Sequence, residues 1–176
     1  MIEWAIGGAI VAVATTAAWF DVRERRIPNA LTVSALGIAL LARAFGGFPD
    51  LGAGLVGAGI CLLLALPLFL AGGLGGGDVK LLTAFGAFLG PGRLLVGFVV
   101  MALVGGAMAL IQMVRKRVVQ RTLWNLYVLF KTLGKGTFTG WKKEGSEAWL
   151  TVDTPGAVTV PYGVAISAGA LYAWFL

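Results

Sequence analysis

The stretch that decides the fold is residues 51–73, LGAGLVGAGICLLLALPLFLAGG, which holds no charged side chain. A bilayer-spanning helix needs roughly 20 consecutive apolar residues, so this run is long enough to cross a membrane. Pro67 lies inside the run, but a proline can kink a membrane helix without ending it. We therefore expect residues 51–73 to form a transmembrane helix.

Further apolar runs lie on both sides of this segment. They cover residues 2–20, 30–45, 79–89, 94–114 and 157–176. The run 79–89 is short for a full crossing, and Arg43 lies near the far end of the run 30–45, where a long side chain can reach the membrane interface. The pattern predicts an all-α integral membrane protein, a polytopic bundle of about six transmembrane helices.

The composition agrees with a membrane protein. Hydrophobic residues make up 59% of the chain and charged residues only 12%, whereas a soluble domain carries about twice that share of charge. The net charge of +6 could suggest a nucleic-acid partner. However, the basic residues stand at the ends of apolar runs, where the positive-inside bias places them. We expect no nucleic-acid partner, and we treat residues 1–176 as a single membrane-embedded domain.

The positions of Lys and Arg predict the orientation in the membrane. They collect after the run 2–20, before the run 79–89 and after the run 94–114. With six alternating crossings, these three places share one side, which the positive-inside bias makes cytoplasmic. Both termini then lie on the opposite side.

A basic insert at about residues 115–154 separates the last two apolar runs. Its first half interleaves basic and apolar residues, which is typical of an interfacial amphipathic helix. A disordered cytoplasmic loop, held near anionic lipid by its Lys and Arg, explains the same composition. Both interpretations stay open, and both make membrane lipid an expected partner.

Cysteine and histidine chemistry is excluded by the inventory. The chain has one cysteine, Cys61, and no histidine, so neither a disulfide framework nor a Cys/His zinc site can be built. We expect Cys61 to pack inside the bundle, and we expect no metal and no cofactor. The chain begins Met-Ile-Glu-Trp, with an acid where a secretory signal would carry Lys or Arg, so the first run is expected to remain as a helix.

Two acids at the margins of the apolar runs are the candidate catalytic residues. Taken singly, Asp21 could be an acid balanced by neighbouring arginines, and Asp78 could be the N-cap of the next helix. Taken together, they lie on one side of the bundle, where they can meet. Two adjacent carboxyl groups tend to share one proton, and such a pair can activate water to attack a peptide carbonyl. None of the His-based schemes is available.

Neighbouring residues could support this site. Gly75 and Gly77 would let the backbone approach an extended substrate, because a side chain there would block it. Lys80 could tune the acids, bind a lipid phosphate or form a structural salt bridge. We expect Asn29 to cap the second helix and Pro161 to kink the last one.

The two acids stand in motifs that resemble a known family. The pattern of Asp21 with Ile-Pro-Asn closing residues 21–29, and the GGGDVKL of residues 75–81, resemble the type IV prepilin peptidases, which are GxGD-type membrane aspartyl proteases. The resemblance covers most of the first four apolar runs, and residues 160–163 are also similar to the start of the family's last helix. It implies cleavage of the leader peptide of prepilins at the cytoplasmic face of the inner membrane, with Asp21 and Asp78 as the catalytic dyad.

The resemblance is to the short form of the family. The larger members also methylate the new N-terminus and carry a cytoplasmic domain with paired cysteines, which this chain does not have. A protease without methyltransferase activity is therefore implied, similar to the peptidases of tight-adherence pili or of archaeal preflagellins. The insert 115–154 is longer than expected for this form and could contact substrate, lipid or a pilus-assembly partner.

Two other classes of protein remain open from the residues alone. A transporter or proton-relay protein could use the same two acids, as buried acids in membranes often do. It is disfavoured because no inverted repeat is visible and both acids lie at one face rather than at the midplane. A non-catalytic membrane subunit of a pilus or secretion machine would need neither acid. The sequence does not indicate an oligomeric state.

Overall fold

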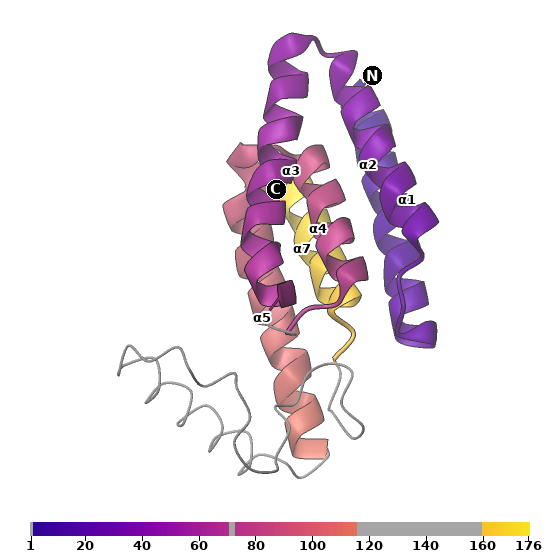
Figure 1. The fold of residues 1–176 in the computed structure, drawn as a ribbon, viewed down its shortest axis with the longest axis vertical. Coiled ribbons are helices and arrows are strands. Elements are labelled where there is room, and N and C mark those ends of the chain that lie inside the picture. The colour runs from indigo at the N-terminus through magenta and orange to yellow at the C-terminus, as the bar shows by residue number, and fades with distance from the viewer. Residues whose placement is uncertain (1, 71–72, 116–159) are drawn as a thin grey trace, which may run out of the picture. The chain divides into compact units, whose positions relative to one another are not determined.

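A computed structural model describes residues 2–70, 73–115 and 160–176. These residues form six helices and no strand (Figure 1). The helices are α1 (Ile2–Glu24), α2 (Asn29–Ala44), α3 (Phe48–Leu70), α4 (Gly76–Leu89), α5 (Pro91–Arg115) and α7 (Tyr162–Phe175). The predicted all-helical class is confirmed. The insert predicted at 115–154, beyond Arg115 itself, lies outside the described residues.

The chain divides into two compact units. The first consists of Met1–Gly106 and Pro161–Leu176, and the second of Ala107–Val160. Every contact discussed below lies within the first unit.

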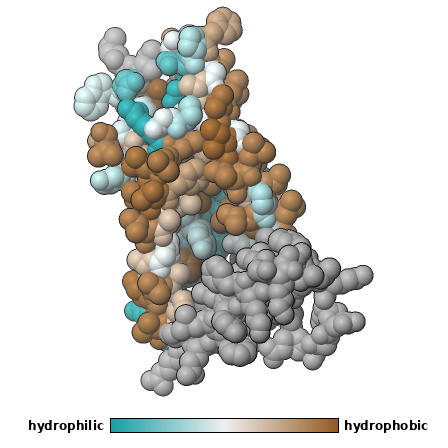
Figure 2. All heavy atoms as spheres, turned by 90° about the vertical axis from the view of Figure 1, so that its left-hand side faces the viewer, coloured by the Kyte–Doolittle hydropathy of each residue, from teal (hydrophilic) through white to brown (hydrophobic). Residues whose placement is uncertain are grey.

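Three helices, α1, α3 and α5, are long and apolar enough to cross a membrane, and α2 and α7 are shorter apolar helices. Exposed hydrophobic side chains cover most of the described face seen in Figure 2. Such a surface is unfavourable in water and favourable in lipid. The fold is therefore an all-helical membrane bundle, as predicted.

Two helix boundaries differ from the predictions in a way that matters for the acids. The first helix was expected to end at Phe20, but α1 continues to Glu24, so Asp21 lies within its last two turns. Arg23 in the last turn is favourable there, because cations stabilise the negative end of a helix dipole. The fourth helix begins at Gly76 rather than at Val79, so two residues of the glycine-rich stretch are helical.

Three prolines mark the starts and the interior of other helices. The third helix was expected to begin at Leu51, but α3 begins at Phe48 and holds Pro49 in its first turn, where a missing N–H costs nothing. Pro67 lies inside α3 without ending it, as predicted. Pro161 does not kink the last helix. It is the N-cap of α7, and the prediction for it was wrong.

Helix α4 is the centre of the bundle, since it packs against α1, α2, α3 and α7. Every residue from 84 to 90 is buried. Gly57 of α3 and Gly86 of α4 lie backbone to backbone, because a side chain on either would meet the carbonyl oxygen of the other. Small residues allow this close approach in membranes, where packing rather than hydrophobicity holds helices together. Cys61 is buried against Gly86, which confirms its packing role.

Arg43 of α2 caps the C-terminal end of α4. Its Nε donates to the Ala87 carbonyl oxygen at 2.6 Å, and its Nη2 donates to the Phe88 carbonyl oxygen at 2.7 Å. The last carbonyls of a helix have no partner within it, and these two lie in an apolar bundle. The guanidinium thus supplies donors to carbonyl groups that need them, and the reach of Arg43 to the membrane interface stays a prediction.

The helices run alternately up and down, so α1 ends where α4 and α7 begin (Figure 1). The N-terminus of α1 lies at the other end. Because Asp21 is near the end of α1 and Asp78 near the start of α4, this arrangement places the two acids at the same end of the bundle.

Candidate active site

Asp21 is buried at the end of α1, with 7% of its surface exposed. Its Oδ2 accepts a hydrogen bond of 2.6 Å from the backbone N–H of Gly163, in the first turn of α7. The N-cap of α7 is Pro161, which makes no side-chain cap. Asp21 therefore supplies, from another helix, an acceptor that the N-terminus of α7 lacks.

Asp78 lies in the first turn of α4 and is partly buried. Its Oδ2 accepts a hydrogen bond of 3.3 Å from the N–H of Gly75. Gly75 is the N-cap, so the alternative in which Asp78 itself is the N-cap does not hold, and Asp78 is the third residue of the helix. The carboxyl reaches back to the cap from the third helical position, as an acid in a capping box does.

The two carboxyl groups lie close enough to interact electrostatically. They also lie at the N-termini of two helices, Asp78 on α4 itself and Asp21 against α7. The N-terminus of a helix carries a partial positive charge that favours nearby anions. Two helix ends thus offset part of the cost of placing two acids within electrostatic reach of each other in an apolar bundle.

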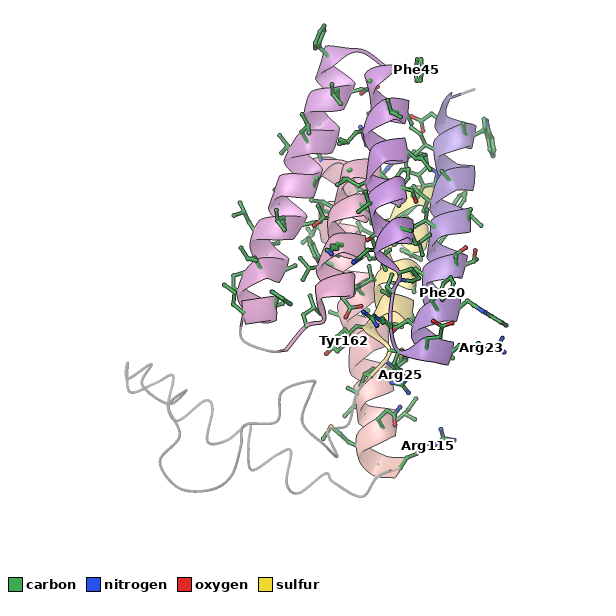
Figure 3. The ribbon with its side chains drawn as sticks, turned by 45° about the vertical axis from the view of Figure 1, so that its right-hand side comes forward. Phe20, Arg23, Arg25, Phe45, Arg115 and Tyr162 are labelled. Carbon is green, nitrogen blue, oxygen red and sulfur yellow. The ribbon has the colours of Figure 1, made fainter. Side chains whose placement is uncertain are left out.

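Figure 3 shows this end of the bundle, with Phe20, Arg23 and Arg25 at the end of α1 and Tyr162 at the start of α7. Arg25 follows α1 with a positive φ of 54°, which is unfavourable for a residue with a side chain by about 1–2 kcal/mol. Its charge acts on the Asp21 carboxyl. The strained turn keeps a cation beside one acid.

Ile27 lies against the residue that precedes Asp78 and against the residue that donates a hydrogen bond to Asp21. It is in the connection from α1 to α2, and only 6% of its surface is exposed. A side chain added at Gly77 would lie 3.2 Å from Cβ of Ile27, and one added at Gly163 would lie 3.0 Å from Cδ1 of Ile27. Both glycines are therefore in tight contact with this one residue.

Of the predicted supporting residues, Gly75 is the N-cap of α4 and Gly77 contacts Ile27. Among the described residues, Lys80 makes no hydrogen bond to either acid. Its Nζ donates instead to Oδ1 of Asn29, at 2.8 Å. Asn29 is the first residue of α2 rather than its N-cap, which is Pro28, so the expected cap was wrong.

A groove of about 180 Å³ lies beside Lys80. It is lined by α2, α3 and α4, with Thr32, Val79 and Thr83 among its residues. In the described residues no group of three or more Asp, Glu, Cys or His side chains could hold a metal ion. Proton transfer between carboxyl groups and water is the chemistry that the two acids can support.

Sequence reasoning found both acids but missed Gly163 and Ile27. Gly163 follows a proline at the start of a helix, and a proline N-cap has no side chain that can bind the first amides. That pattern signals amides in need of an acceptor, although it does not say which residue supplies one. Ile27 lies in the motif of residues 21–29. Hydropathy does not distinguish an isoleucine that contacts the candidate site from one that only packs in the core.

The fold and the location of the acids define a class, that of helical membrane proteins with two carboxyl groups at the same end of the bundle. The type IV leader peptidase family matches residues 8–110, more than half of the chain. The chain belongs to this family. Both Asp21 and Asp78 lie within the matched part, and Gly163 lies beyond it.

Two curated relatives are prepilin leader peptidase/N-methyltransferases. The one from Neisseria gonorrhoeae is 32% identical over 119 residues, which cover 63% of this chain and 42% of the relative. The one from Aeromonas hydrophila is 36% identical over 99 residues, which cover 52% of this chain and 34% of the relative. The matches thus span well under half of the length of these relatives. No solved structure matches the chain.

Proposed function

We propose that this protein is an intramembrane aspartyl endopeptidase that removes the leader peptide of type IV prepilin-like substrates. The observation that carries the proposal is the location of Asp21 and Asp78, on two helices, at the same end of the bundle and within electrostatic reach of each other. Membership of the type IV leader peptidase family supports the same reaction. The two curated relatives are both named as prepilin leader peptidases, which supports the same reaction.

The proposed chemistry uses one proton shared by the pair. The ionised carboxyl takes a proton from a water molecule as its oxygen attacks the peptide carbonyl carbon, while the protonated carboxyl donates to the carbonyl oxygen. The tetrahedral intermediate then collapses. The C–N bond breaks as a proton passes to the leaving amine, which releases a carboxylic acid and an amine and returns the pair to its singly protonated form.

The proposed setting is the inner (cytoplasmic) membrane, with the acids toward the cytoplasm. The positive-inside distribution of Lys and Arg supports this orientation, since Arg23 and Arg25 lie at the same end as the acids. The proposed substrate is a small prepilin with a short basic leader that ends in Gly. We propose peptidase activity without methyltransferase activity for this chain.

The experiment is co-expression with a candidate prepilin, followed by the shift of the prepilin on a gel. The wild type should shorten the substrate, and Asp21→Asn and Asp78→Asn should each abolish shortening. Asparagine keeps an oxygen that can accept the hydrogen bond from Gly163 or Gly75, so both variants should remain folded in the membrane.

Asp50→Asn is the matched control. Asp50 is an exposed aspartate in the first turn of α3, so it shares the residue type but not the site. This variant should cut at the wild-type rate. Cleavage that survives either site substitution would contradict the two-acid mechanism. Absence of cleavage by the wild type, with ion flux in reconstituted vesicles, would favour the transport class instead.

A further inference from the structure

We propose that Ile27 is a positioning residue that sets the separation between the Asp21 and Asp78 carboxyl groups. The inference rests on the proposed function and adds a spacing element to it. Ile27 lies against Gly77, which precedes Asp78 on α4, and against Gly163, which donates a hydrogen bond to Asp21 from α7. It does so from the short connection between α1 and α2.

The contact on the Asp78 side is made through Gly77. A Cβ at Gly77 would lie 3.2 Å from Cβ, 3.4 Å from O and 3.6 Å from N of Ile27. The backbone of α4 therefore rests on the backbone and the side-chain root of Ile27. Because Gly77 directly precedes Asp78, any movement of Ile27 against α4 moves the origin of the Asp78 side chain.

The contact on the Asp21 side is made through Gly163. A Cβ at Gly163 would lie 3.0 Å from Cδ1 of Ile27 and 2.9 Å from Oδ2 of Asp21. The same glycine donates its N–H to that oxygen. The tip of Ile27 thus bears on the residue that holds Asp21 in place.

The connection that carries Ile27 is itself restrained. Arg25 N–H donates to the Asp21 carbonyl oxygen at 3.1 Å, which closes the end of α1. Pro28 follows, and a residue before proline is confined to extended conformations. Ile27 also has a β-branched side chain, which has few rotamers. A stiff side chain on a short, restrained connection can serve as a spacer between α4 and α7.

The length of the Ile27 side chain should therefore affect the rate of catalysis more than substrate binding. Ile27→Ala removes the δ-carbon that faces Gly163 and keeps Cβ, O and N, the atoms that face Gly77. A misplacement of reacting groups by about 1 Å can lower a rate by about 100-fold. We expect kcat to fall 30- to 100-fold in Ile27→Ala with KM changed less than threefold, and to fall by a smaller factor in Ile27→Val, which also lacks Cδ1 but keeps both γ-carbons.

Ile10→Ala is the matched control. Ile10 is a fully buried isoleucine of α1, so its truncation removes the same atoms from the same core. It should lower the unfolding temperature of the purified protein by at least as much as Ile27→Ala while it keeps kcat near the wild-type value. Equal losses of kcat in the two variants would mean that Ile27 acts only through stability, and would overturn the inference.

A second measurement reads the separation without peptidase activity. Asp21→Cys with Asp78→Cys, in a Cys61→Ala background, is treated with a two-carbon bis-methanethiosulfonate reagent, and intact mass separates bridged from doubly modified protein. With Ile27 present the bridged species should dominate, and with Ile27→Ala it should fall at least fivefold. Equal bridging with and without the Ile27 side chain, or no bridging in either protein, would overturn the inference. The two proposals can fail separately. If the double-cysteine protein with Ile27 is bridged as expected but the wild-type protein does not cut prepilin, only the proposed function is contradicted.

Discussion

Both ends of α4 lie beside charged side chains, but the hydrogen bonding of those side chains differs between the two ends. At the C-terminal end, the Arg43 guanidinium donates to two carbonyl oxygens of α4 at 2.6 and 2.7 Å. At the N-terminal end, the carboxyl of Asp78 accepts one long hydrogen bond from Gly75 and lies near the carboxyl of Asp21. The Arg43 charge therefore completes the hydrogen bonding of a helix end. The Asp21 and Asp78 carboxyl groups keep oxygens that can exchange protons.

The difference teaches how to separate structural from chemical charges in an apolar bundle. A buried charge is retained for structure when its partners are groups that would otherwise lack a hydrogen bond. Two charges of the same sign side by side have no such reason, since each raises the cost of the other. The N-terminal end of α4 is therefore the end to test for chemistry, and the C-terminal end is the one to test for stability.

The largest effect is expected where α3 supports α4 near its C-terminal end. Gly57→Ala should lower the free energy of unfolding by about 3 kcal/mol, because its methyl group would run into the Gly86 backbone, which cannot move as a side chain can. Unfolding in detergent micelles measures this. Gly59→Ala, two residues away with open space around it, should be neutral or stabilising. Equal effects of the two variants would contradict the close approach of α3 and α4.

A slightly smaller loss is expected for Arg43→Met, about 2–3 kcal/mol, because two carbonyl oxygens would lose their donors in an apolar setting. The protein that remains folded should cut prepilin at the wild-type rate, since Arg43 lies at the end of α4 away from the acids. Arg23→Met is the control. Arg23 is exposed and rests on the Trp19 ring at 5.4 Å, a contact worth about 0.5–1 kcal/mol. A rate loss in folded Arg43→Met would show that both ends of α4 serve the chemistry.

Gly163→Ala moves the test to the N-terminal end. Its methyl group would lie 2.9 Å from Oδ2 and 3.0 Å from Cβ of Asp21, so the carboxyl must shift. We expect the cleavage rate to fall about 30-fold, equivalent to about 2 kcal/mol of transition-state stabilisation. Gly106→Ala, with open space around it, should leave the rate unchanged. A Gly163→Ala enzyme of wild-type rate would mean that the α7 amide does not orient Asp21.

The smallest effect is expected for Lys80→Met, less than threefold in cleavage rate or about 0.6 kcal/mol. Lys80 is exposed, and its hydrogen bond goes to Asn29 rather than to either acid. Asn29→Ala should give a change of the same size. A loss above tenfold in Lys80→Met alone would contradict this expectation. It would show that the Lys80 ammonium group acts at the site together with the two acids.

The helices and the two acids could be predicted from the sequence, because a long apolar run and a charge at its margin are local properties. Boundaries were less accurate where polar residues continue a helix, as from Asp21 to Glu24, since helical hydrogen bonds do not require apolar side chains. The start of α4 was set too late for a similar reason. The apolar run begins at Val79 because hydropathy does not mark glycines as helical, but Gly76 and Gly77 form the first turn of α4 and face Phe69 and Ile27.

By itself, then, the sequence determined that this is a helical membrane protein with two candidate acids at one side of the bundle. Tertiary structure alone decided which group holds Asp21, whereas Asp78 is held by its near neighbour Gly75. The Gly163 amide reaches Asp21 across 142 positions of the chain, and Arg43 reaches the carbonyls of α4 across 44 and 45 positions. Hydropathy and helix periodicity describe neighbours along the chain. The partners of a buried polar group are set by which helix ends are brought together, and only the packed bundle brings them together.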